Sequence, residues 1–586
     1  MSSSIAHEDQ ESGSPETDSD QGGNTDERRS RWRRIADVVI APPTFGGLVM
    51  ALIFGWQSFA PTLMPRTALV QGAICAISIT MGYAVGTVLG RLVRYLLKST
   101  NRSISHGSWR KARIVLATVA GIATVVGVVM WLAWQNRQRD LLGMDHLGPA
   151  NIIVVIIAGV VLTAILFVIG RLIGAAVRSL DRWLNKRIPR IISVTITVIV
   201  VSVVANYALR DVAFSHFTVW ADTTFGEKDA SIDKTLTPPE SPTVSGSPDS
   251  LVTWESLGMQ GRAFVADVTT REQLADYWGE DATFTDPVRA YVGVGDGDMV
   301  DNAKTAVAEL DRAGGFDRGV LVVATATGSG WIDPDAARAI EMMHKGDTAI
   351  VTLQYSFLPS WISFLVGLDQ SAEAGTDLFN AVSDHWSQLP PDQRPKLIVF
   401  GLSLGSYGAE SAFAGVNAET SLANVMARTD GVLLAGPTNF NPMHEQLVAG
   451  RDKGSSVWLP VFGEQEDVVF ITRDPSQNVP DEPETWPLVY VQHTSDPVTH
   501  WGFNWLWSPS GWNETPRGFD VPNTGTWFPF VTWTQGVFDL MAGFSAPPGF
   551  GHDYRLDYVN AWSRVVPPDD WSTTERDRLM KYLNED

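Results

Sequence analysis

Long apolar stretches without charge occupy the first third of the chain. A helix needs about 20 residues to cross the hydrocarbon of a bilayer. Five stretches of roughly that length contain no Asp, Glu, Lys or Arg, and they lie near residues 43–60, 68–89, 114–134, 152–170 and 191–209. Buried helices of a soluble protein are the alternative, but they rarely lack charge so completely. The pattern predicts a helical membrane domain of about five spans.

The loops between these stretches alternate in charge. A basic run at residues 28–34 precedes the first stretch, and residues 90–113 and 171–190 are rich in Lys and Arg. Residues 61–67 and 135–150 are nearly neutral. Because basic loops stay in the cytoplasm, this alternation places the N-terminus there. With five spans, everything after residue 209 is expected outside the cytoplasm, and no cleavable signal peptide is evident.

The pattern changes after residue 250, where short apolar runs alternate with amphipathic segments. Runs that read as strands buried on both faces are 319–324, 348–353, 396–400, 431–434 and 488–492, and helical patterns cover 303–310, 334–343, 378–386 and 407–414. Buried strands alternating with helices predict an α/β domain with a mostly parallel sheet.

Charge divides the chain at the same place. Residues 1–210 carry 22 Lys and Arg against 12 Asp and Glu, a net charge of +10, whereas residues 211–586 carry 22 against 53, a net charge of −31. An acidic domain would repel phosphates, so nucleic acid is not an expected partner. The predicted units are a disordered cytoplasmic tail (1–34), a multi-pass membrane domain (35–210), a Pro- and Ser-rich linker (211–250) and a catalytic domain (251–586).

One serine sits in the sequence context of a hydrolase nucleophile. The segment Gly401-Leu402-Ser403-Leu404-Gly405 follows a predicted strand directly and leads into a predicted helix. A strand, then G-x-S-x-G, then a helix is the context of a nucleophile elbow, whose tight turn leaves room only for glycine beside the serine. A structural glycine-rich turn is the alternative. We favour Ser403 as the nucleophile.

The acid and the base are expected in the order Ser, Asp or Glu, His. Asp496 follows the strand at 488–492, and His552 lies in a Gly/Pro-rich loop near the C-terminus. We predict Asp496 as the acid, with Asp467 as the alternative, and His552 as the base. His493 and His500 flank Asp496, so a metal site is a further alternative, disfavoured because a strand and Pro497 interrupt any shared helix face.

An oxyanion hole requires backbone amides beside the nucleophile. The amide of Leu404 is one predicted donor, and the loop containing Thr327, Gly328 and Ser329 is predicted to supply another. A phosphate-binding loop is the alternative for these residues, but the Lys of a P-loop is missing.

Two further features carry weaker expectations. Tryptophans gather in residues 500–535, between the predicted acid and base, where they suit either a lid or membrane-facing belt or ordinary core packing. Gly82, Gly86 and Gly90 repeat every four residues, a spacing that lets another helix approach closely and is compatible with a homo-oligomer.

The chain resembles a family of actinobacterial membrane α/β-hydrolases. The residues that carry the resemblance are Ala60-Pro61-Thr62-Leu63-Met64-Pro65-Arg66, Thr327-Gly328-Ser329-Gly330-Trp331, Tyr355-Ser356-Phe357-Leu358-Pro359-Ser360-Trp361, the segment around Ser403, Gln492-His493-Thr494-Ser495-Asp496-Pro497, and Gly551-His552. Met64 stands where the family usually has Leu, and Phe550 where it more often has His. The resemblance implies an α/β-hydrolase fold and a serine catalyst, but no substrate.

Together these features predict a membrane-anchored serine hydrolase that acts outside the cytoplasm on an acyl ester of a lipid or envelope glycolipid. Acyl transfer between envelope lipids, glycans or proteins is the alternative within catalysis. A transporter would need polar groups in the spans, which are absent, and a non-catalytic binding protein would need a broken triad. No cofactor or metal is expected.

Overall fold

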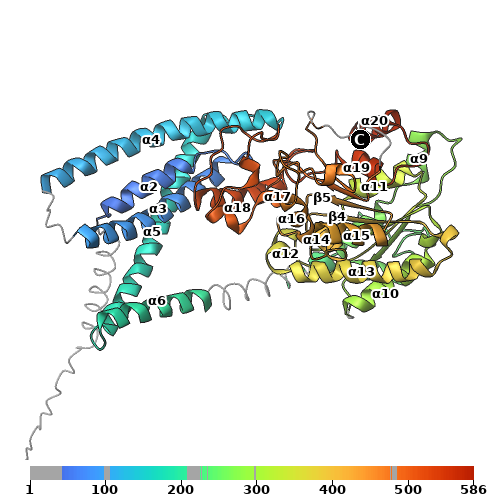
Figure 1. The fold of residues 1–586 in the computed structure, drawn as a ribbon, viewed down its shortest axis with the longest axis horizontal. Coiled ribbons are helices and arrows are strands. Elements are labelled where there is room, and N and C mark those ends of the chain that lie inside the picture. Colours follow the sequence, from blue (N-terminus) through green and yellow to red (C-terminus); the bar gives the residue numbers. More distant parts are fainter. Residues whose placement is uncertain are drawn as a thin grey trace, which may run out of the picture.

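The fold has a helical part and a sheet-containing part, which lie side by side in the computed structural model (Figure 1). The structure describes residues 42–97, 106–207, 223, 225, 228–233, 235–295, 298–474, 477 and 485–585. We call residues 42–207 the helical domain and residues 235–585 the sheet domain. The predicted cytoplasmic tail and most of the segment between the two domains lie outside the described residues.

The helical domain consists of long apolar helices. Their bounds are α2 (Phe45–Gln57), α3 (Ala68–Leu97), α4 (His106–Leu141), α5 (Ala150–Leu184) and α6 (Arg190–Tyr207). Large apolar side chains point away from the protein along α3 to α6, for example Val88, Ile122 and Val160, each more than 60 % exposed. Such a continuous apolar surface is typical of helices that face lipid.

The prediction of five spans is wrong for the described residues, where three helices are long and apolar enough to cross a membrane. These lie at Ala68–Leu96, Arg110–Leu141 and Ala150–Leu184. Helix α2 has 13 residues and is therefore about 20 Å long, short of the roughly 30 Å of hydrocarbon. The apolar part of α6, Arg190–Val204, is also shorter than a span. Apolar residues of the connection after α2 lengthened the first stretch in the sequence.

The repeated glycines of α3 have a partner within the chain. A Cβ atom on Gly86 would lie 2.1 Å from the carbonyl oxygen of Gly46 on α2, and one on Gly82 would lie 2.5 Å from that of Met50. Only glycine permits this approach of the two backbones. The spacing therefore packs α3 against α2.

The predicted α/β sheet is confirmed, and it is parallel throughout. Seven strands are ordered β1-β3-β2-β4-β5-β7-β6. Their bounds are β1 (Val288–Val292), β2 (Val320–Thr325), β3 (Thr348–Leu353), β4 (Lys396–Leu402), β5 (Gly431–Ala435), β6 (Val468–Ile471) and β7 (Leu488–Val491). Nearly every residue of these strands is buried, as expected for a sheet covered on both faces.

Helices flank this sheet (Figure 1). The α-helices are α8 (Gly258–Ala266), α9 (Arg271–Trp278), α10 (Met299–Arg312), α11 (Pro334–Met343), α12 (Ser360–Val366), α13 (Leu368–Gln388), α14 (Leu404–Ser411), α15 (Ala418–Arg428), α16 (Pro442–Ala449), α17 (Pro497–His500), α18 (Val531–Gly543), α19 (Tyr558–Val565) and α20 (Thr573–Glu585). Short 3-10 helices are η3 (Trp254–Leu257), η4 (Gly315–Asp317), η5 (Pro391–Gln393), η6 (Gly463–Gln465), η7 (Phe503–Leu506) and η8 (Gly511–Asn513).

The end of the predicted linker packs on the sheet domain. Val244 forms a parallel bridge with Arg289 of β1 and is fully buried. The hydroxyl of Ser245 donates to Glu309 on α10 at 2.9 Å. The folded sheet domain thus includes residues before 251. Their Pro- and Ser-rich composition predicted a linker and gave no sign of these contacts.

Loops of the helical domain contact the tryptophan-rich segment of the sheet domain. A single apolar cluster contains Leu63, Met64 and Leu142 together with Trp501, Trp505, Trp512 and Val521. Trp505 and Trp512 are almost completely buried, whereas Trp507 is 67 % exposed. Most of this segment therefore forms a packed core between the two domains, at the place where α17 and α18 meet the helical domain in Figure 1.

Candidate functional site

Ser403 occupies a strained turn between β4 and α14. Its φ and ψ are 58° and −126°, a conformation that an L-residue adopts rarely. A Cβ atom on Gly405 would lie 2.2 Å from the carbonyl oxygen of Thr325, and one on Gly401 would lie 2.4 Å from that of Gly405. Glycine on both sides therefore allows the chain to reverse here, as the G-x-S-x-G pattern predicted. The turn places Ser403 at the carboxyl ends of the parallel strands.

Asp496 and His552 are joined directly. The Oδ2 atom of Asp496 lies 2.7 Å from Nδ1 of His552. Asp496 follows β7 and caps α17, where its Oδ1 accepts from the amide of Val498 at 2.8 Å. Asp496 is fully buried and His552 is 8 % exposed. Two residues that are 56 positions apart in the sequence therefore form one hydrogen-bonded pair.

The ring of His552 lies beside the strand that neighbours Ser403. The amide of Ser403 donates to the carbonyl oxygen of Ala435, the last residue of β5, at 2.9 Å. Gly436 follows with a φ of 50°, and a Cβ atom there would lie 2.8 Å from Cε1 of His552. The histidine therefore lies at the same strand ends as the serine. The Nε2 atom of His552 is buried and has no hydrogen-bond partner within the described parts of the chain.

The hydrogen bonds around Asp496 hold it as a carboxylate. Burial raises the pKa of Asp496, but the His552 ring and the hydrogen bonds from His552 and Tyr554 outweigh burial and lower it below the ordinary value of the carboxyl. The Tyr554 hydroxyl donates to Oδ2 at 2.7 Å, and burial next to this carboxylate raises the pKa of the phenol. Sequence reasoning missed Tyr554, whose only signal was its position two residues after His552.

The loop with Thr327, Gly328 and Ser329 lies next to Ser403. It follows β2, which pairs with β4, and the contact between Gly405 and Thr325 brings the two turns together. The Thr327 amide donates to the carbonyl oxygen of Trp331 at 3.0 Å, so it is already used within the loop. Leu404 begins α14, so its amide is at the N-terminus of that helix.

The alternative residues lie elsewhere or have other partners. Asp467 precedes β6. It therefore lies at the amino ends of the parallel strands, whereas Asp496 lies at their carboxyl ends. His493 stacks on Tyr554 with ring centroids 4.3 Å apart, and its Nε2 lies 3.1 Å from Asp557. Across the described ranges, no group of three or more His, Cys, Asp or Glu residues is arranged to hold a metal ion.

A buried acid supports the helix that follows Ser403. Glu410 on α14 accepts from the Tyr490 hydroxyl at 2.7 Å and from the Met443 amide at 2.8 Å. Burial raises its pKa to about 7, well above the ordinary value of about 4.3. Between these two values the folded protein keeps a proton that the unfolded chain has released. Stability contributed by this proton is present at low pH and is lost as the pH rises towards 7.

We therefore expect Glu410→Gln to change how stability depends on pH. The wild type should lose thermal stability relative to the variant between pH 5 and pH 8, because only the wild type must ionise a buried group. Melting curves of both purified proteins in the same detergent at several pH values measure this difference. If the melting temperatures of the two proteins changed in parallel over that pH range, Glu410 would have an ordinary pKa.

Comparisons with known proteins agree with the observed α/β fold. A model of an α/β-hydrolase family matches residues 288–579. A model of the N-terminus of an α/β-hydrolase family matches residues 59–268. Neither the curated proteins nor the solved structures contain a match. The two family models cover most of the helical domain and nearly the whole sheet domain, and the chain belongs to this α/β-hydrolase family.

Proposed function

We propose that the protein is a serine hydrolase with Ser403 as nucleophile, His552 as base and Asp496 as acid. The observation that carries the proposal is the 2.7 Å contact between Asp496 and His552 at the strand ends where Ser403 turns. A serine, an aspartate and a histidine, in the chain order typical of α/β-hydrolases, lie at the carboxyl ends of the parallel strands.

The reaction follows from the roles of these groups. The hydroxyl of Ser403 attacks an acyl carbonyl, and Nε2 of His552 takes the hydroxyl proton. His552 then returns this proton to the leaving oxygen, and a water molecule hydrolyses the acyl-enzyme by the same route. Asp496 holds the ring with Nε2 free to accept. We assign the oxyanion hole to the amide of Leu404 and to Gly328 or Ser329, since the Thr327 amide has a partner in its own loop.

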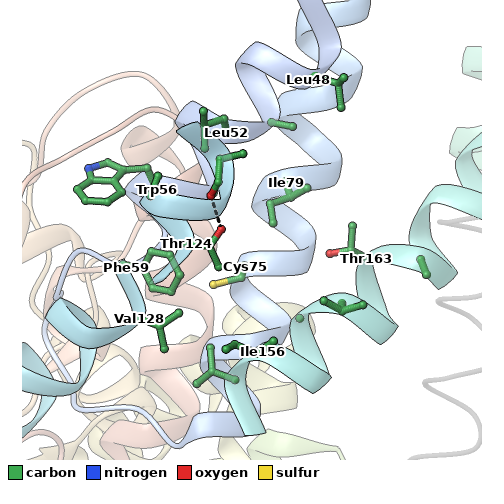
Figure 2. A pocket seen from close by; sticks show the side chains of 18 of the residues that line it. Leu48, Leu52, Trp56, Phe59, Cys75, Ile79, Thr124, Val128, Ile156 and Thr163 are labelled. Carbon is green, nitrogen blue, oxygen red and sulfur yellow. Dashed lines mark hydrogen bonds between the residues drawn. The ribbon is translucent and has the colours of Figure 1, made fainter. Parts of the chain in front are cut away.

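We propose a lipid ester as the substrate. The helical domain contains a cavity of about 540 Å³ between α2, α3, α4 and α5, within the range of about 300–1,000 Å³ for small-molecule sites. Figure 2 shows Phe59, Cys75, Val128 and Ile156 around this space, and its lining is almost entirely apolar. The end of the cavity near Phe59 is next to the loop that contacts the sheet domain. An apolar cavity of this size beside the hydrolase domain suits the acyl chain of a lipid substrate. Acyl transfer is the second candidate, since the same acyl-enzyme serves both reactions.

We also propose that the sheet domain lies outside the cytoplasm. It packs against residues 60–66 and 142–144, which belong to the two nearly neutral loops. The basic residues of the α3–α4 and α5–α6 connections lie at the other ends of these long helices. The positive-inside rule assigns those basic ends to the cytoplasm. The proposal does not depend on whether α2 crosses the membrane. Because α5 ends at the basic side, it does require the chain to cross back between α5 and the sheet domain, where α6 begins.

Reporter fusions test the orientation. A reporter that is active only outside the cytoplasm should be active when fused after Asp586. The same reporter fused after Lys186, in the basic connection before α6, should be inactive. The opposite pair of results, checked with a reporter that works only in the cytoplasm, would reverse the orientation.

A fluorophosphonate probe and a lipid assay test the activity of the full-length protein. The probe should label the wild type at a single site, because it reacts with activated serines. Reconstituted into phospholipid vesicles, the protein should release fatty acid from ester-linked lipids. Intact protein that neither reacts with the probe nor turns over any vesicle lipid would rule out the proposed function.

A further inference from the structure

The loop at residues 60–66 has no part in the proposed reaction, although it carries a distinctive sequence. It connects α2 and α3 of the helical domain, yet it is buried in the sheet domain. Thr62 and Leu63 are completely buried, and Arg66 is 2 % exposed. The backbone of a loop and the polar side chains of Thr62 and Arg66 are normally hydrated, so their burial requires specific hydrogen-bond partners.

The partner is Asp539, in the middle of α18. Its Oδ2 accepts hydrogen bonds from the Thr62 hydroxyl and from the Leu63 amide, the latter at 3.2 Å. The Nε atom of Arg66 lies 3.2 Å from Oδ1, in an ion pair that is almost inaccessible to solvent. Arg66 also donates to the Thr62 hydroxyl. Three groups of the helical domain thus hold a single carboxylate of the sheet domain.

The loop is itself held firmly from both domains. The Arg66 amide donates to Oε1 of Gln135 at 2.5 Å, and Nε2 of Gln138 donates to the Thr62 carbonyl oxygen at 2.7 Å. From α18, Nε2 of Gln535 donates to the carbonyl oxygen of Ala60 at 2.9 Å. Because buried side-chain amides fix its backbone, the loop presents Thr62 and Arg66 in one position.

Helix α18 leads from Asp539 to the loop that carries His552. The His552 amide donates to the carbonyl oxygen of Gly543, the last residue of α18, at 3.2 Å. The ring of Phe544, which follows α18, meets the His552 ring edge-on with centroids 5.0 Å apart. A Cβ atom on Gly551 would lie 3.2 Å from the terminal methyl of Met64, so the 60–66 loop also reaches the residue before His552.

We propose that Thr62, Arg66 and Asp539 are positioning residues for His552, so that the helical domain sets the geometry of the hydrolase site. This inference rests on the role of His552 in the proposed function. The reaction needs Nε2 of His552 within hydrogen-bond reach of the serine oxygen, and a shift of about 1 Å can cost roughly 100-fold in rate. Gly543 at the end of α18 holds the backbone of His552, and Phe544 packs on its ring, so both add to the Nδ1 contact with Asp496.

A purely structural role makes a different prediction from a positioning role. If the loop only attached the two domains, its loss would reduce the fraction of correctly folded protein. The molecules that remain folded would react at the normal rate. A positioning role instead lowers the rate in every molecule while the number of reactive sites is unchanged. The fluorophosphonate probe separates these cases, because its final labelling counts the sites and its time course gives the rate.

The test compares Thr62→Val, Arg66→Met and Asp539→Asn in the full-length protein. Each variant should be labelled to the same final extent as the wild type, but about 10- to 100-fold more slowly. Thr62→Ser keeps the hydroxyl that contacts Asp539 and should restore the rate. Asp286→Asn is the matched control for the charge change, because it removes an exposed partner of Arg271 far from this loop and should leave the rate unchanged.

Normal labelling rates in Thr62→Val and Arg66→Met would overturn the proposal, as would a reduced extent of labelling at an unchanged rate. Thr62→Val replaces one hydroxyl by a methyl group, so it keeps the test valid if the charge variants fail to fold. Absence of labelling in the wild type would contradict the serine hydrolase proposal instead, so the two failures are distinct.

Discussion

Ser403→Ala is expected to lower turnover of the lipid ester by at least about 10⁴-fold and to abolish labelling by the fluorophosphonate probe. The alanine keeps the backbone but removes the only oxygen that can form the acyl-enzyme. Nucleophile variants of serine proteases lose roughly 10⁶-fold, because the histidine and the acid contribute nothing without the serine. The measurement is the initial rate of fatty acid release from vesicles, at equal amounts of folded protein.

The matched control is Ser411→Ala, which makes the same change at the far end of the helix that follows Ser403. The Ser411 hydroxyl only donates to the Tyr407 carbonyl oxygen within α14, so this variant should keep its activity and its labelling. Circular dichroism and elution volume in detergent should be the same for both variants and the wild type. Labelling that persists in Ser403→Ala would place the nucleophile at another residue.

Five of the seven strands were predicted from their mostly apolar runs, and β6 was missed although all four of its residues are apolar. The run at 348–353 matches β3 residue for residue, and the other four agree within one or two positions. Strand β1 was missed because Arg289 interrupts its apolar pattern. In the fold Arg289 is completely buried, and its guanidinium lies 2.7 Å from Glu341. The buried arginine is neutralised by an ion pair with a residue distant in the sequence. The hydrophobic pattern around Arg289 does not reveal such a partner.

The helical domain shows a second limit of local patterns. Uncharged stretches predicted a helix wherever apolar residues continued, but α2 ends at Gln57 and the next ten residues form a connection to α3. Residues 60–64 are apolar apart from Thr62 because they enter the sheet domain, where Leu63 and Met64 pack against tryptophans. Hydrophobicity indicates burial, and lipid and protein bury such residues equally well.

The proposed site residues carry sequence signals that the residues around them lack. Chain order and the position of Asp496 after a strand were enough to select it, and the fold places it against His552. Tyr554 and Asp539 have no motif of their own. Their contacts arise because α18 and the C-terminal loop return to the strand ends, an arrangement that only the tertiary structure specifies.

The second large loss of activity is expected when Asp496, which we propose as the acid in preference to Asp467, is replaced. Asp496→Asn should lower the catalytic rate by about 10⁴-fold while substrate binding changes little, as an equivalent change does in serine proteases. The carboxylate accepts a hydrogen bond from Nδ1–H of His552 and stabilises the imidazolium that forms when Nε2 takes the serine proton. An amide can donate to Nδ1 instead, which favours the wrong tautomer and leaves Nε2 unable to accept. The low pKa of Asp496 keeps this group charged throughout neutral and mildly acidic pH.

Asp467→Asn makes the identical chemical change and should cost less than about tenfold in rate. Asp467 lies before β6 rather than after a strand. It is therefore at the amino ends of the parallel strands, whereas Ser403 is at their carboxyl ends, and it cannot contact the imidazole of His552. Initial rates at several lipid concentrations, with folding checked by circular dichroism and elution volume in detergent, separate an effect on rate from one on binding. A large loss in Asp467→Asn with normal turnover in Asp496→Asn would transfer the acid role to Asp467. Ser403 and His552 would keep their roles, and the 2.7 Å contact of Asp496 would then be structural.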